Sequence, residues 1–198
     1  MNISYFLSYL SLFLSICFYC SHSYASNPGT LTVKFGQTTE DMFKATHPYA
    51  ESVGVNKELG GNIYKEMPNE NKEVNKDIVH EDLKSVFILF DQNKSLTALQ
   101  LQFKNDCFSI LSKFMEKKYS VIVKKTSLFG SNYMELYHDR VAIYLITPSF
   151  FSETSLLYIA TDVRDEILKN LPKATLEDER ETLNAILERS FTPNRVAR

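Results

Sequence analysis

The chain has 198 residues, and its 22 Lys and Arg against 24 Asp and Glu give a formal net charge of −2. This near-balance argues against binding to nucleic acid or to anionic membranes through charge alone, because such binding depends on a large positive field. The composition is 44% hydrophobic with 14 Phe and 11 Tyr, which is enough for a core and excludes wholesale disorder, and three Cys exclude a dense disulfide scaffold.

Residues 1–25 have the features of an export signal. No charged residue occurs between Tyr5 and Cys20, and the stretch is rich in Phe and Leu. It is shorter than the roughly 20 apolar residues of a membrane-spanning helix, and Ser23-Tyr24-Ala25 offers small residues for cleavage after Ala25. We therefore expect a periplasmic or secreted bacterial protein that keeps no stable membrane span after cleavage. An uncleaved anchor is the alternative.

The first part of the mature chain shows weak patterns. Residues 30–36 alternate between apolar and polar, which predicts a strand that ends at Gly36. Thr38 or Thr39 can then cap a short helix over 41–45 that stops before His47-Pro48. Residues 50–79 are rich in turn formers and predict a loop-rich segment with one strand near 62–65.

A clearer pattern begins at residue 84. The nearly continuous apolar run 84–90, the polar turn 91–95 and the alternating run 96–104 predict a β-hairpin. In the second strand one face is expected to carry Thr97, Leu99, Leu101 and Phe103. Asn105-Asp106 then caps a helix whose apolar face comprises Phe108, Leu111, Phe114, Met115 and Tyr119.

The rest of the chain predicts strands at 120–124, 132–137, 141–147 and 156–160, then helices at 162–171 and 175–191, the last capped by Thr175. This order indicates an α+β fold with an antiparallel sheet, helices packed on one face and a helical C-terminal extension. We expect a signal peptide at 1–25, an α+β domain at 26–160 and the extension at 161–198. The repeated order of helix and strands hints at two similar halves.

The segment Phe35-Gly36-Gln37-Thr38-Thr39-Glu40-Asp41-Met42 resembles the G-x-T-x-x-[ED]-[VM] start of small exported bacterial domains, of which the SmpA/OmlA lipoproteins are the best-known group. The chain lacks the lipid-attachment cysteine of that group and is longer. The resemblance implies a small exported α+β domain, and a role in outer-membrane assembly is an expectation that it raises.

Candidate reactive residues are few. Cys107 is the only cysteine of the expected mature chain and stands at the start of a predicted helix, where backbone N–H groups can lower the pKa of a thiol. His80-Glu81-Asp82 and His138-Asp139 pair a base with carboxylates, but neither site has the spacing of a metal motif. We therefore expect no catalytic, metal or cofactor site. A small enzyme that uses Cys107 or the His80 cluster is an alternative.

The function that we expect is non-catalytic binding of another protein of the envelope or of an exported enzyme, as an assembly accessory, an inhibitor or an immunity-type factor. A secreted virulence factor is an alternative that the same signal would serve. The binding residues would be apolar positions of the last predicted helix and tyrosines of a predicted strand: Leu176, Leu183, Ile186, Leu187, Tyr133 and Tyr137.

Overall fold

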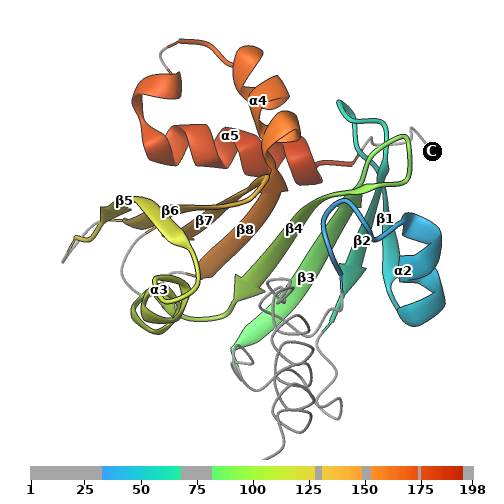
Figure 1. Cartoon of the computed structure of the whole chain (residues 1–198), viewed down its shortest axis with the longest axis horizontal. Coiled ribbons are helices and arrows are strands. Elements are labelled where there is room, and N and C mark those ends of the chain that lie inside the picture. The colour runs from blue at the N-terminus through green and yellow to red at the C-terminus, as the bar shows by residue number, and fades with distance from the viewer. Residues whose placement is uncertain (1–32, 68–81, 128–130, 149–152, 174, 194–198) are drawn as a thin grey trace, which may run out of the picture.

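The computed structural model describes residues 33–67, 82–127, 131–148, 153–173 and 175–193 (Figure 1). Over these residues the chain is α+β, with one eight-stranded antiparallel sheet and a C-terminal helix. The elements in chain order are α2 (Glu40–Thr46), β1 (Glu51–Val55), β2 (Asn62–Glu66), β3 (Leu83–Phe90), β4 (Leu96–Phe103), α3 (Phe108–Met115), β5 (Ser120–Lys125), β6 (Asn132–His138), β7 (Val141–Thr147), β8 (Thr154–Ala160), α4 (Thr161–Lys169), the 3-10 turn η1 (Thr175–Glu177) and α5 (Glu179–Phe191).

The sheet consists of two halves with the same element order, as the sequence hinted. Each half is one helix followed by four strands, and the strand order β1-β2-β3-β4-β8-β7-β6-β5 places the last strand of each half at the centre. β4 and β8 pair antiparallel from Ala98↔Ile159 to Phe103↔Thr154 and so join the halves. The two outermost strands carry a register irregularity at similar places, between Ser52 and Gly54 in β1 and between Val121 and Val123 in β5.

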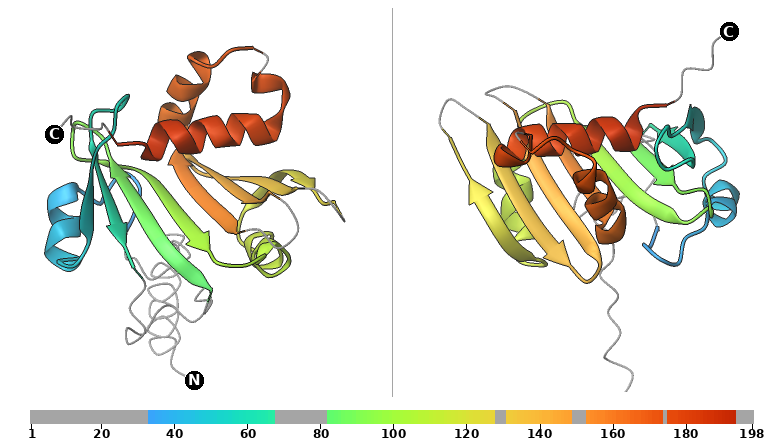
Figure 2. Two further views of the ribbon diagram at one scale, coloured as in Figure 1. Left: turned by 180° about the vertical axis from the view of Figure 1, so that it is seen from behind. Right: turned by 90° about the horizontal axis from the view of Figure 1, so that it is seen from above.

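Helices cover both faces of the sheet. On one face α2 and α3 contribute Phe43, Phe108 and Leu111 to a core with the strands. On the other face the C-terminal extension contributes Ile167 of α4 and Leu183 and Ile186 of α5 to a second core. Figure 2 shows α5 crossing over the strands on this second face. The helical extension is therefore packed on the sheet, which buries its Ile167, Leu183 and Ile186.

Most of the predicted elements are present, and the side-chain pattern explains why. Leu99, Leu101 and Phe103 of β4 enter the first core while Ala98 enters the second, so the predicted alternation is confirmed. In α2 the Oγ1 of Thr39 accepts a hydrogen bond from the Met42 N–H at 3.3 Å, as expected of a cap.

Three local predictions were wrong. Of the strand predicted at 30–36, residues 30–32 lie outside the described residues, and 33–36 form no strand. Gly36 has a φ of +73°, and the Thr38 N–H bonds the Lys34 carbonyl, which makes a turn. β1 was missed because it is an outer strand, exposed along most of its length, and shows no alternation. The last helix begins only after η1, and its cap is Asp178, not the predicted Thr175. The Asp178 carboxylate accepts the Glu181 N–H at 3.0 Å.

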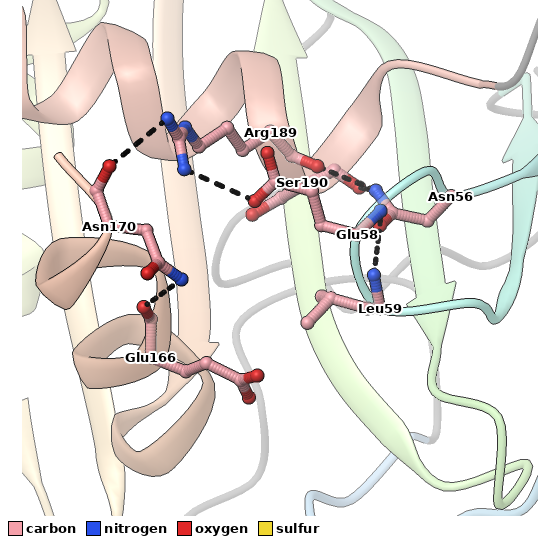
Figure 3. A network of polar contacts seen from close by, with 7 residues as sticks. All are labelled: Asn56, Glu58, Leu59, Glu166, Asn170, Arg189 and Ser190. Atoms are coloured by element: carbon pink, nitrogen blue, oxygen red, sulfur yellow. Dashed lines mark hydrogen bonds and ion pairs between the residues drawn. The ribbon is translucent and has the colours of Figure 1, made fainter.

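A buried side-chain amide fastens the end of α5 to the first half of the sheet (Figure 3). Asn56 follows β1 and is fully buried; its Nδ2 donates to the carbonyls of Arg189 at 2.6 Å and Ser190 at 2.8 Å. Its Oδ1 accepts from the N–H groups of Glu58 and Leu59 at 2.9 and 2.7 Å. One side chain thus satisfies backbone groups of a loop and of a helix end that are more than 130 positions apart in the sequence.

The Asn56→Ala substitution is expected to lower the free energy of unfolding by about 3 kcal/mol, because it leaves buried backbone groups of α5 and of the loop without partners. Equilibrium urea unfolding measures this change. Asn184→Ala, an exposed position of α5, is the control and should change the stability by less than about 0.5 kcal/mol. Equal effects of the two substitutions would contradict the role of Asn56.

Candidate binding surface

The predicted binding residues of the last helix are used for packing. Leu183 and Ile186 are buried in the second core, and Leu187 is partly buried against it. Leu176 belongs to η1 and is 45% exposed. With α5 in place, only Leu176 of this group is open to a partner.

The two predicted tyrosines, Tyr133 and Tyr137, lie on one face of β6, and Glu135 lies between them on the same face. Tyr133 is buried in the second core, whereas Tyr137 is 40% exposed. The Tyr133 hydroxyl donates to Glu135 Oε2 at 3.3 Å. The two tyrosines predicted from the sequence thus share one strand face, and of the two only Tyr137 is accessible.

Arg164 of α4 completes this surface, and sequence reasoning missed it. Its Nη1 lies 3.8 Å from Glu135 Oε1, and its Nη2 lies 2.8 Å from the carboxylate of Asp165. Burial raises the pKa of the neighbouring Tyr144 to about 12, with a further contribution from Glu135, so that this hydroxyl stays protonated at neutral pH. We call the exposed Tyr137 and the partly exposed Glu135 and Arg164, with the buried Tyr133 and Tyr144 that support them, the tyrosine–arginine surface.

Cys107 has neither the exposure nor the low pKa of a nucleophilic cysteine. Its side chain is buried beside Asp82, with Sγ 3.8 Å from a carboxylate oxygen, and its N–H donates to Thr154 Oγ1 at 2.8 Å. Burial raises the pKa of the thiol to about 11, and the negative charge of Asp82 adds to the shift. A protonated, buried thiol is a poor nucleophile at neutral pH.

Of the two candidate histidines, the structure describes His138, and His138 is remote from Cys107. Cys107 contacts Thr154 at the first residue of β8, whereas His138 lies opposite Val141, which pairs with Ala160 at the last residue of β8. The two sites are therefore about 20 Å apart, at ~3.3 Å per strand residue. His138 packs edge-on against Tyr119 at 5.3 Å between ring centroids. His80 lies outside the described residues.

A buried carboxylate between α2 and β2, that of Glu40, is held by several polar groups. Glu40 Oε1 accepts from Tyr64 Oη at 2.5 Å and from Asn62 Nδ2 at 2.9 Å, and Lys44 Nζ lies 3.1 Å away. Burial alone would raise the pKa of Glu40, but these hydrogen bonds and the Lys44 charge outweigh it and lower the pKa. Glu40 is only 2% exposed, so the cluster fixes α2 to the sheet.

A cavity of about 330 Å³ between two loops and α4 is lined by several carboxylates. Asp91 accepts N–H groups of its own turn, Asp162 accepts the N–H of Val163, and Glu58 lies 3.4 Å from Arg189. These carboxylates are engaged in local structure. Among the described residues no group of three or more His, Cys, Asp or Glu converges as a metal site, and no helix is long and apolar enough to span a membrane.

The buried thiol leads to a labelling prediction. In a chain whose Cys17 and Cys20 are replaced by Ser, Cys107 should react with iodoacetamide at pH 8 about 100-fold more slowly than a free cysteine, because few thiolates are present. Mass spectrometry of the native protein over time measures the rate. The same protein in urea should react at the ordinary rate, and fast labelling of the native form would contradict the assignment.

Comparison with known proteins finds no relative of this chain. No family model, no curated protein and no solved structure matches the chain. The resemblance of residues 35–42 to the SmpA/OmlA group thus stays a prediction from the sequence.

Proposed function

We propose that this chain is an exported, non-catalytic protein-binding module of the bacterial cell envelope, where it acts as an assembly accessory, an inhibitor or an immunity-type factor. The observation that carries the proposal is the tyrosine–arginine surface: Tyr137 is 40% exposed, Glu135 lies two residues before it on the same face of β6, and Arg164 Nη1 approaches Glu135 Oε1 at 3.8 Å. Tyr and Arg are the residue types that most often dominate the binding energy of protein interfaces.

Two further features support binding over catalysis. The thiol of Cys107 is protonated and buried, which weighs against the alternative of an enzyme built on this residue. Glu135 is held by Tyr133 and Arg164, so the polar groups beside Tyr137 are fixed before a partner arrives. Such preorganisation reduces the entropy lost on association. The apolar amino-terminal stretch supports export.

Site-specific photo-cross-linking in the bacterium that makes the protein tests this proposal. A benzophenone amino acid at Tyr137 should give covalent adducts with a partner protein, and the same probe at Tyr49, an exposed tyrosine beyond the end of α2, should not. Arg164→Ala should weaken the adduct at Tyr137. Equal yields at both positions, or none at Tyr137 in the exported fraction, would count against the proposed function.

A further inference from the structure

The turn between β3 and β4 contains a sequence motif that the proposed binding function does not use. Residues 91–95 are Asp-Gln-Asn-Lys-Ser, so that Asn93 is followed by a serine at the second position. Asn-x-Ser, with any residue but proline in the middle, is the acceptor motif for N-linked sugars in exported proteins. Asn93 is the only asparagine after residue 25 that is followed by Ser or Thr at this position.

The Asn93 side chain is accessible for such a reaction. It is exposed, and within the described part of the chain its amide has no hydrogen-bond partner. A carboxamide nitrogen is a weak nucleophile because its lone pair is delocalised into the carbonyl, so a transferase must be free to rotate and polarise the amide. Asn93 also borders the cavity of about 330 Å³ described above. The folded protein therefore leaves space beside Asn93 for a first sugar residue.

The backbone of the turn keeps Asn93 at the surface. The Asp91 carboxylate accepts the N–H groups of Asn93 at 2.9 Å and of Ser95 at 2.8 Å. The Lys94 N–H donates to the Asp91 carbonyl at 2.9 Å, and Lys94 has a φ of +61°. Such an Asx-type turn holds the residues between the two strands in one conformation. A sugar on Asn93 would thus point away from the paired strands without disturbing their register.

The serine of the motif is less accessible than the asparagine. Ser95 is partly buried and forms a bridge with Thr39, and the Lys94 carbonyl accepts the Glu40 N–H at 2.9 Å. A transferase that recognises the Ser95 hydroxyl must therefore act before the segment ahead of α2 closes over the turn. A newly exported chain passes through this open state as it folds.

We propose that Asn93 is an N-glycosylation site. The donor is an oligosaccharide linked to a polyprenyl diphosphate in the membrane. Asn93 Nδ2 forms a bond to C1 of the first sugar, the bond from C1 to the diphosphate oxygen breaks, polyprenyl diphosphate leaves, and the amide loses one proton to a base of the transferase. Asp91, two positions before the acceptor, supplies a negative charge that a cationic subsite of the transferase can bind.

This inference rests on the export that is part of the proposed function, and mass spectrometry tests it. The full chain, tagged at its carboxyl terminus, is recovered from the exported fraction of the bacterium that makes it. We expect the peptide that contains Asn93 to carry the added mass of hexose and N-acetylhexosamine residues. Asn93→Gln and Ser95→Ala should each lose this mass, whereas Ser95→Thr keeps the hydroxyl and should retain it. Ser109→Ala, at an exposed serine of α3, is the control and should stay modified.

Other results contradict the proposal in distinguishable ways. An exported chain without added mass would overturn the glycosylation and leave the protein-binding function standing. Added mass that persists in Asn93→Gln and disappears in Ser95→Ala would place a sugar on the serine hydroxyl and overturn the assignment to Asn93. Added mass that persists in Ser95→Ala would show that the motif is not what the transferase recognises. A chain found only in the cytoplasm would overturn both the export and the inference that rests on it.

Discussion

The pairing of β4 with β8 is the interaction on which the rest of the structure depends. Each half alone would end in a long apolar strand with unpaired backbone groups, a form prone to aggregation. The antiparallel contact from Ala98↔Ile159 to Phe103↔Thr154 removes both inner edges at once. It also places β4, which is buried along nearly its whole length, at the centre of the sheet, where both faces are covered.

The joined sheet explains the use of the C-terminal helices. A centre buried on both faces needs a second layer, and α4 and α5 supply it with Ile167, Leu183 and Ile186. Asn56 then fixes the far end of α5 over the first half. At the outer end of the second half, Tyr137 of β6 stays exposed, and Arg164 of α4 approaches Glu135 on the same strand.

Prediction from the sequence was most accurate for the elements in which burial imposes a regular pattern of apolar side chains. β7 was located to the residue, and the two faces of β4 were assigned correctly, because packing on each side imposes alternation. β1 was not predicted because an exposed outer strand has no such alternation. In the candidate surface Tyr137 could be named in advance, whereas Arg164 could not, since its approach to Glu135 depends on how α4 packs on the sheet. Leu183 and Ile186 showed the periodicity of a buried stripe, which does not reveal whether the covering surface is the chain's own sheet or a partner.

Native-state hydrogen exchange tests most directly whether the β4–β8 contact makes the two halves one cooperative unit. The account predicts that the slowest amides of β4 and of β8, among them those of Leu99, Leu101, Leu157 and Ile159, exchange only through global unfolding and share one free energy of opening. If instead the amides of one half exchanged with a free energy of opening lower by about 2 kcal/mol or more and with a smaller dependence on denaturant, the halves would unfold separately. That result would contradict the central role of the pairing.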